Sequence, residues 1–596
     1  MKAMTKGLVT LLLFYCVTLA GHAKLVEFVL TNQELLLDRD SQPYNDYLSQ
    51  LNKQLGQPQS INTLAIIQLN SHNQTVKIEQ LTSPLVLRGE MFNPQTGLIE
   101  SVTNQPLATG NLYLDIDENE GINKILIFSP KTMPETGLTW QFSTERNVAL
   151  TNIGIKEKIG ESVFKLVDNG PSSNRVDLVF VAEGYTQNEI ARFKEDLTAV
   201  VNGFFEEHPI SLYKSYFNVW GVESISNQSG AGYSYPKDTR FKSYFNCYNI
   251  DRLLCVDISE VQKYVSQRLS SHSRDIIVVV VNTDKYGGSG GAVATMSLHS
   301  SAVDLALHEV AHTFGLLADE YDYGSCRVAP ASEANVTNNR SGNKWSHWFD
   351  VANNVNVFEG AKYCRYGMYR PTNNSLMRAL GQPFYAVNSE QLIRRIYSFT
   401  TPLSSQTPNT KTINISTQQQ QAFSASLLQP TTKTVTAKWQ LNDKQVSSAT
   451  DFTFMGNNYP PGTYQLTVEA QDKTKHVIVD RNNRLKDAFT WTINLKAGSH
   501  QCHTPASPTH LTAQILDKNT FQLSWLAPEH AQHYTVQRLI EGTWQDEVST
   551  TATMTEISNL APESEQLVRV IGANGCDEMG KASEPLEVSL KRTLNF

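Results

Sequence analysis

The sequence predicts a multidomain chain in which a central α/β domain is flanked by β-sandwiches. Three observations carry this prediction. The chain has 596 residues, more than one hydrophobic core usually serves. Residues 24–157, and again those after 403, show short strand patterns that alternate with polar turns. Between them, residues 158–402 mix apolar strand-like runs with helical spacing.

Residues 1–23 have the composition of a secretory signal peptide. Lys2 and Lys6 precede an apolar run over residues 8–20, and Gly21 and Ala23 are small residues where a signal peptidase reads. The apolar run is short for a membrane span, and no later stretch is apolar enough to cross a bilayer. We therefore expect cleavage after Ala23 and a secreted chain (periplasmic, cell-surface or extracellular) without stable membrane insertion.

Charge and cysteine content agree with export. The net charge of -8 is spread along the chain without a basic block, which argues against a nucleic-acid partner. Of seven cysteines, one (Cys16) lies in the predicted signal peptide, and an even number in an exported chain indicates disulfide bonds. Proximity favours three pairs among the possible connectivities: Cys247–Cys255, Cys326–Cys364 and Cys502–Cys576.

The N-terminal region, residues 24–157, is predicted to be a β-sandwich. Residues 25–30 and 125–128 are typical strand segments, and no long helical period competes with them. The strands are separated by polar turns, as two packed sheets require.

The central region, residues 158–402, is predicted to be an α/β domain. Residues 176–181 form an apolar run typical of a buried strand. Helical spacing follows Thr186 and continues to Phe204. Residues 276–281 are all apolar and mostly β-branched, which predicts a central strand of a sheet that is covered on both faces.

Two further β-sandwiches are expected after a linker rich in Thr, Gln and Ser near residues 400–421. Residues 403–500 resemble an immunoglobulin-like module and contain Trp439. Residues 501–596 resemble a fibronectin type III module. Leu567 stands where the fibronectin pattern usually has its corner tyrosine.

The segment 301–315 carries the chemistry. Ser301 and Asp304 have capping-box spacing, which predicts a helix start, and Gly315 is expected to end the helix in a left-handed conformation. The residues between are apolar on nearly all sides, so the helix should be buried. It nevertheless carries two histidines and a glutamate, which would cost several kcal/mol to bury without partners.

A divalent metal would satisfy these polar groups. His308 and His312 are four residues apart, so both rings lie on one helix face and can direct a nitrogen at one ion. Glu309 lies beside them and is the candidate general base for a metal-bound water. Two imidazoles and a carboxylate suit one catalytic zinc ion. The alternative is a hydrogen-bonded pair of core histidines.

The third ligand is expected just after the helix. A turn at Gly315 would bring the next residues back beneath the metal, and a catalytic zinc usually has three protein ligands and one open position. Asp319 is the preferred ligand and Glu320 the fallback. The acid that does not bind the metal could orient a histidine.

The residues His308-Glu309-x-x-His312-x-x-Gly315 resemble the metzincin class of zinc metallopeptidases, except that the usual third-ligand position is Ala318 here. The longer pattern through Asp319, Glu320 and Tyr321 is similar to the bacterial IgA-peptidase family. The segments 169–171, 183–186 and 216–219 strengthen this resemblance, which covers roughly residues 160–400.

Three further features fit this resemblance. Ser375-Leu376-Met377 would supply the methionine turn beneath the metal, although Met377 could also be an ordinary core residue. The glycine-rich residues 286–295 could let a peptide backbone pair as an added strand, or could form a loop. Tyr321 and Tyr385 are candidates for stabilising the oxyanion.

The expected function is therefore that of a secreted zinc endopeptidase that hydrolyses peptide bonds of a protein or glycoprotein substrate. The competing hypothesis is an inactive adhesive or binding protein in which the β domains contact the partner. The presence of Glu309 favours the enzyme, because an inactive chain has no chemical need for this residue.

Overall fold

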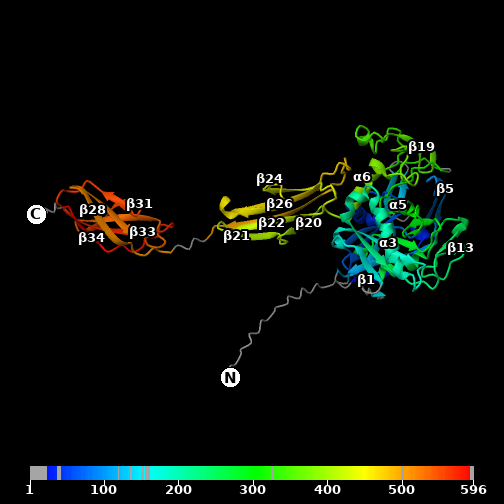
Figure 1. Cartoon of the computed structure of the whole chain (residues 1–596), viewed down its shortest axis with the longest axis horizontal. Helices are drawn as coiled ribbons and strands as arrows, with labels where there is room; N and C mark the ends of the chain where they lie inside the picture. Colours follow the sequence, from blue (N-terminus) through cyan, green and yellow to red (C-terminus); the bar gives the residue numbers. More distant parts are fainter. Residues whose placement is uncertain are drawn as a thin grey trace, which may run out of the picture. The chain divides into compact units, whose positions relative to one another are not determined.

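The computed structural model describes residues 23–36, 42–117, 120–133, 137–148, 153–154, 162–323, 326, 328–498 and 503–590 (Figure 1). The predicted signal peptide lies outside the described residues apart from Ala23. The chain divides into two compact units. The first comprises Met1–Ile413, Ala422–Thr453 and Tyr464–Thr492, and the second comprises Asn414–Gln421, Phe454–Thr463 and Ile493–Phe596.

An eight-stranded sheet is the centre of the first unit. Its strands lie in the order β10 (Val163–Val167), β12 (Phe217–Val222), β11 (Val176–Glu183), β15 (Ile276–Val281), β17 (Ala294–Ser297), β16 (Gly288–Gly291), β4 (Val86–Phe92) and β5 (Ile99–Pro106). Strands β12, β11, β15 and β17 are parallel, and the remaining pairs are antiparallel. The predicted strands at 176–181 and 276–281 are confirmed.

Helices cover both faces of this sheet, as a buried parallel sheet requires. Helices α3 (Ile190–Glu206), α5 (Ala302–Thr313) and α6 (Tyr385–Ile396) pack in one core with alternate residues of β11, such as Leu178 and Phe180. Helix α4 (Ile258–Ser266) packs in the core on the other face, with Val179 and Val181. The predicted α/β domain is confirmed.

The N-terminal region forms two sheets around a shared core. One has the order β6 (Thr109–Asp117), β1 (Ala23–Thr31) and β9 (Ile153–Gly154). The other has the order β3 (Thr75–Thr82), β2 (Thr63–Asn70), β7 (Ile122–Met133) and β8 (Gly137–Asn147). Phe28, Ile66 and Ile127 pack together between the sheets. The region also contains helices that were not predicted, α1 (Asn32–Leu36) and α2 (Asn45–Leu55).

The hairpin β4–β5 belongs to the N-terminal region in sequence but to the central sheet in space. Strand β4 pairs with β16, with Arg88 opposite Gly290 and Leu87 opposite Gly291. This pairing places side chains from near residue 90 beside the strand of the glycine-rich segment 286–295, which the sequence analysis predicted as an edge for a peptide.

The remaining strands form small pairs and the predicted sandwiches. The pairs are β13 (Gly232–Tyr233) with β14 (Tyr244–Phe245), and β18 (Phe358–Ala361) with β19 (Cys364–Arg370). The next strands are β20 (Leu403–Thr407), β22 (Gln420–Leu427) and β25 (Asp451–Met455) in one sheet, and β21 (Thr412–Ser416), β27 (Lys486–Lys496), β26 (Gly462–Asp472), β23 (Val435–Leu441) and β24 (Lys444–Ser447) in another. Trp439 and Trp491 stack at 5.7 Å between ring centroids.

The last sandwich has one sheet of β28 (Thr509–Asp517), β29 (Thr520–Leu526) and β32 (Met554–Ile557). Its second sheet contains β31 (Thr543–Thr550), β30 (His533–Ile540), β33 (Glu565–Ala573) and β34 (Leu586–Ser589). Trp525, Tyr534 and Val570 lie in its core.

Two of the predicted disulfide bonds are confirmed, Cys247–Cys255 and Cys326–Cys364. The third predicted pair includes Cys502, which lies outside the described residues. Among the helices of the described ranges, none is both long and apolar enough to cross a membrane.

The packing of α3 on the sheet can be tested at Leu197, which is 0% exposed in the core between α3 and β11. We expect Leu197→Ala to destabilise the protein by about 2–5 kcal/mol, because it removes buried methyl groups and leaves a cavity. Glu195→Ala, on the exposed face of the same helix, should change stability by less than about 0.5 kcal/mol. Calorimetric unfolding of both variants measures the difference, and equal effects would contradict this packing.

Candidate metal centre

Helix α5 holds the site inside the protein. His308 and Glu309 are 0% exposed and His312 is 6% exposed. The apolar residues around them pack into the core under the central sheet, as the apolar periodicity predicted. The three polar side chains are therefore buried and need partners in the protein or a bound ion.

The ends of α5 differ from the prediction. Ser301 makes no side-chain cap, and Asp304 instead accepts a hydrogen bond from Gly381 N at 3.1 Å. The left-handed residue after the helix is Leu316, with φ of 55°, rather than Gly315. Gly315 is required for space: a Cβ there would lie 2.5 Å from Ala311 O and 2.8 Å from Leu392 Cδ2.

The two histidine rings are fixed by main-chain carbonyls. His308 Nδ1 lies 2.8 Å from Leu376 O, and His312 Nδ1 lies 2.7 Å from Leu317 O. Because a carbonyl oxygen only accepts, both Nδ1 atoms carry the proton. In the neutral rings both Nε2 atoms then present lone pairs, and these atoms are only 2.9 Å apart. A cation between them is the arrangement that turns this repulsion into attraction.

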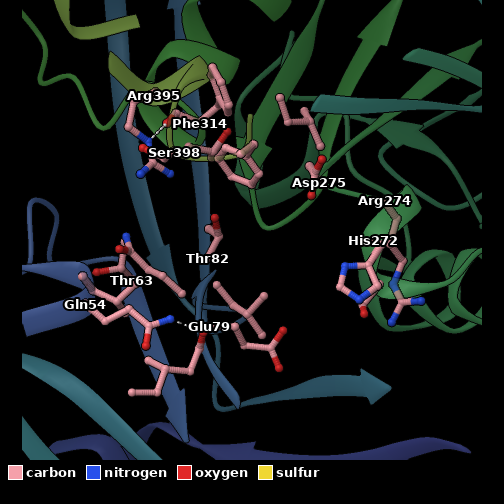
Figure 2. A pocket seen from close by; sticks show the side chains of 18 of the residues that line it. Gln54, Thr63, Glu79, Thr82, His272, Arg274, Asp275, Phe314, Arg395 and Ser398 are labelled. Carbon is pink, nitrogen blue, oxygen red and sulfur yellow. Dashed lines mark hydrogen bonds between the residues drawn. The ribbon is translucent and has the colours of Figure 1, made fainter. Parts of the chain in front are cut away.

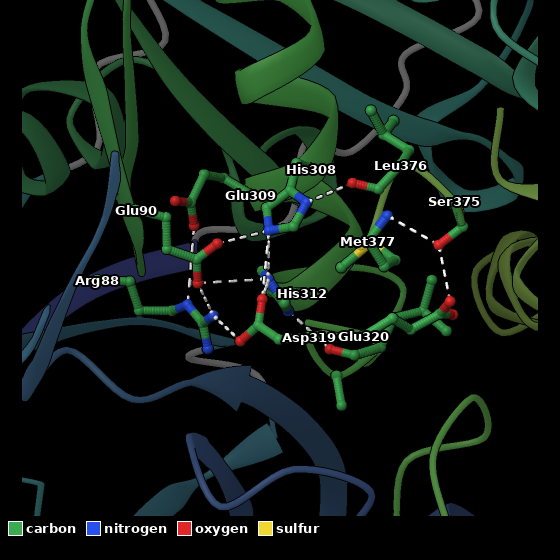
Figure 3. A network of polar contacts seen from close by, with 12 residues as sticks. Arg88, Glu90, His308, Glu309, His312, Asp319, Glu320, Ser375, Leu376 and Met377 are labelled. Carbon is green, nitrogen blue, oxygen red and sulfur yellow. Dashed lines mark hydrogen bonds and ion pairs between the residues drawn. The ribbon is translucent and has the colours of Figure 1, made fainter. Parts of the chain in front are cut away.

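Two carboxylates complete the group around the histidines (Figure 3). Asp319 Oδ1 lies 3.4 Å from His308 Nε2 and 3.1 Å from His312 Nε2. Glu90 Oε2 lies 2.5 Å from His308 Nε2, and Glu90 Oε1 lies 3.7 Å from His312 Nε2. One donor atom from each of the four residues lies within 4.8 Å of the others, and all four residues are buried.

Glu320 lies outside this group and is held by three other polar side chains. Its carboxylate accepts hydrogen bonds from Ser375 Oγ (2.8 Å), Asn388 Nδ2 (2.9 Å) and Asn335 Nδ2 (3.0 Å). Its backbone N donates to Met377 O at 2.8 Å. The fallback ligand of the sequence analysis therefore anchors the segment 375–377 instead of facing the histidines.

The segment Ser375-Leu376-Met377 lies beside the histidines, next to the metal-site group, where the methionine-turn resemblance places it (Figure 3). Leu376 supplies the carbonyl that orients His308. Met377 is 0% exposed.

Glu309 lies next to the metal-site group without being part of it. No described side chain donates a hydrogen bond to its buried carboxylate oxygens, and its charged neighbour is Arg88, whose Nε lies 3.8 Å from Glu309 Oε2. Burial raises the pKa of Glu309 to about 7, the charge of Glu90 adds to this effect, and Arg88 opposes it. Gly290 has no room for a side chain, because a Cβ would overlap the Glu309 carboxylate.

Charge balance also favours a cation. Glu90, Asp319 and Glu309 contribute three carboxyl groups, whereas Arg88 contributes one guanidinium group, which pairs with Glu90 and with Asp319 Oδ2 at 3.1 Å. Burial alone would lower the pKa of His308, but Glu90 and Asp319 raise it to about 10. The surroundings thus demand positive charge at the point where the two Nε2 atoms meet, and the donor set fits a divalent metal ion.

The tyrosine that donates a hydrogen bond to the metal-site group is not one of the two predicted candidates, Tyr321 and Tyr385. Tyr363, which was not predicted, donates a hydrogen bond to Asp319 Oδ2 at 2.6 Å. Tyr321 is buried against Phe92 and Tyr363. Tyr385 begins α6 and is not one of the residues that the metal-site group contacts within the described part of the chain.

Sequence reasoning also missed Arg88 and Glu90. Their signal was available: Leu85-Val86-Leu87-Arg88-Gly89-Glu90-Met91-Phe92 is an apolar strand interrupted by two charges. Residues two apart share one face of a strand, so both side chains point the same way. What the sequence could not show is that this face meets α5, which lies about 200 residues later.

Two cavities are candidate substrate sites. The larger, about 770 Å³, is lined by residues such as Gln54, Arg274 and Arg395 and contains none of the metal-site group (Figure 2). The smaller, about 380 Å³, is lined by His312, Asp319 and Gly291 among others. We regard the smaller cavity as the relevant one, because it opens onto the residues that can perform chemistry.

Comparison with known proteins agrees with this site. Residues 164–354 match the family model described as IgA Peptidase M64, and this range contains His308, Glu309, His312 and Asp319. This part of the chain is therefore an M64 metallopeptidase domain, and the resemblance found in the sequence is confirmed. A search among curated proteins gives no match.

Solved structures that resemble this chain include fibronectin type III domains. "Structure of FN3tt mut" is 17% identical and covers 15% of this chain and 100% of that chain, with a TM-score of 0.15. The FN1–FN3 domains of chicken CNTN1 are 14% identical and cover 32% of this chain and 67% of that chain, with a TM-score of 0.15. The titin kinase with its flanking domains is 22% identical, covering 14% of this chain and 16% of that chain, with a TM-score of 0.13.

The different surroundings of Asp319 and Glu320 lead to a test. We expect Asp319→Asn to weaken metal binding by about 100-fold or more, because Asp319 is the proposed ligand, whereas Glu320 only supports the neighbouring chain. Glu320→Gln should retain the metal but lower the melting temperature, because it disturbs three buried hydrogen bonds. Metal per chain after dialysis, measured by mass spectrometry, separates the two. Loss of metal in Glu320→Gln with retention in Asp319→Asn would reverse the assignment.

Proposed function

We propose that this protein is a secreted zinc-dependent endopeptidase in which His308, His312 and Asp319 bind zinc and Glu309 acts as general base. The observation that carries the proposal is the pair of Nε2 atoms 2.9 Å apart, both oriented by carbonyls, with Asp319 and Glu309 beside them. We also propose that residues 158–402 form the catalytic domain, between the β domains at 24–157, 403–500 and 501–596.

Zinc is the metal that these donors favour. Two imidazoles and a carboxylate form a common ligand set of catalytic zinc sites, and hard cations such as calcium and magnesium prefer oxygen donors alone. When bound, zinc lowers the pKa of a coordinated water and polarises the carbonyl of the scissile bond.

The residues of the chain then supply proton transfer and orientation. Glu309 has two buried carboxylate oxygens without hydrogen-bond donors, so one oxygen can take a proton from the attacking water and later give it to the leaving amine. Leu376 O and Leu317 O hold the two imidazoles in the tautomer that binds metal. Tyr363 holds Asp319 through its second oxygen, which leaves Oδ1 directed at the histidines.

The proposed substrates are proteins or glycoproteins outside the cytoplasm. An M64 domain acts on peptide bonds, and an extended peptide backbone can pair with the edge of a sheet. Strand β16 lies beside Glu309 and pairs with β17 on one side. Its other side, which pairs with β4 in this structure, is the edge at which we propose that a substrate strand binds. Export is supported by the disulfides Cys247–Cys255 and Cys326–Cys364.

The role of Glu309 can be tested by Glu309→Gln. We expect this variant to keep about one zinc per chain and to lose peptide-bond cleavage by about 100-fold or more, because the amide cannot accept the proton from water. Cleavage sites in a mixture of denatured proteins, mapped by mass spectrometry over long incubation, give the rate. Unchanged cleavage in Glu309→Gln would exclude Glu309 as the base.

Removal of the metal gives a second test. A strong chelator should abolish cleavage, and added zinc should restore it, because without the ion nothing activates the water or polarises the scissile carbonyl. The chelated protein should also melt at lower temperature, since three carboxyl groups then remain buried with one guanidinium group. A chain that binds no metal and cleaves nothing would instead support the adhesive or binding function.

A further inference from the structure

The edge strand β16 is already occupied by another part of the same chain. Strand β4 pairs with β16 in antiparallel register, with Arg88 opposite Gly290 and Leu87 opposite Gly291. The same edge would receive an extended peptide substrate in the proposed function. Strand β4 thus lies where a substrate strand would lie.

Strand β4 also fills the metal site. Glu90 is 1% exposed, and its carboxylate reaches both histidines, at 2.5 Å from His308 Nε2 and 3.7 Å from His312 Nε2. With His308, His312 and Asp319 it makes four protein donors around one point. Four protein ligands are typical of a closed, structural zinc site, whereas a catalytic site leaves one position for water.

The same strand engages the general base. Arg88 lies two residues before Glu90 on the same face of β4 and contacts Glu309, Asp319 and Glu90. Its guanidinium group therefore stands against the carboxylate that would accept the proton from water. One strand accordingly covers the peptide-binding edge, the fourth metal position and the base.

The tip of the hairpin is attached to the catalytic region as well. Leu380 N donates to Gly97 O at 2.9 Å, and Leu98 pairs with Ala379. Arg252 Nη1 donates to Phe92 O at 2.9 Å. The first two contacts involve the segment that follows Met377 and the third involves Arg252, so the hairpin is attached at its tip and at the end of β4.

We propose that the chain folds as a latent peptidase, in which β4 acts as an internal substrate-like strand and Glu90 occupies the position of the catalytic water. Full activity then requires β4 to leave the edge of β16, which frees the fourth metal position and Glu309 together. The slow cleavage expected of the unmodified chain over long incubation comes from the molecules in which β4 has left this edge. This inference rests on the proposed function, because latency has meaning only if the site cleaves peptides. The closure of the metal position can nevertheless be measured without cleavage.

The experiment uses full-length protein loaded with zinc and acetohydroxamate as a small metal-binding probe. We expect Glu90→Gln to bind acetohydroxamate at least about tenfold more tightly than the unmodified chain, because the amide is a poor zinc ligand and the fourth position opens. The variant should also release zinc to a chelator faster and cleave denatured protein faster. Glu90→Ala repeats the test with the side chain removed. Glu145→Ala, an exposed acid in β8, should behave as the unmodified chain.

A measurement on the unmodified chain makes the test independent of the variants. With cobalt in place of zinc, a closed site should keep the intense visible absorption of four-coordinate cobalt when acetohydroxamate is added. A spectrum that changes at low acetohydroxamate would show an open position and overturn the proposal. Equal probe binding and equal cleavage in the unmodified chain and Glu90→Gln would also overturn it and leave the peptidase function intact. Tighter probe binding in Glu90→Gln with no cleavage by either protein would contradict the peptidase function while keeping the closed site.

Discussion

Two imidazole nitrogens that face each other 2.9 Å apart in the interior are the constraint on which the rest of the site depends. Both rings are held by carbonyls on their far side, so neither can turn away. Their lone pairs, with the carboxylates of Glu90 and Asp319, require a cation at their meeting point. The surrounding structure holds the two imidazole rings and the two carboxylates in this arrangement.

The groups that orient the histidine rings belong to turns that lie outside α5. Close approach at Gly315 and the left-handed Leu316 reverse the chain, so that Leu317 O reaches one histidine and Asp319 returns to the metal site. Glu320 then ties the returning chain to the segment that carries Leu376 O. Adjacent acids thus have opposite roles: Asp319 faces the histidines, and Glu320 holds the turn beneath them.

The sequence predicted what depends on local pattern. The buried strands at 176–181 and 276–281, the helix through Phe193 and the histidine pair on one helix face follow from periodicity and spacing alone. Glu90 and Arg88 could not be found this way, because their role depends on a hairpin leaving its own region to pair with β16. The left-handed position was placed at Gly315 because glycine has the intrinsic preference, whereas local packing needed glycine for its size and put the turn at Leu316.

The hairpin β4–β5 has a consequence for how the protein matures. Its contact with His308 spans 218 residues, so the metal-site group is completed only after β4 has paired with β16 and Glu90 has met α5. Pairings so distant in sequence are slow to form, because the entropy of closing a long loop opposes them. All four residues can therefore hold a metal ion only once this pairing has formed, so the ion available where the chain folds sets how much of the protein carries metal.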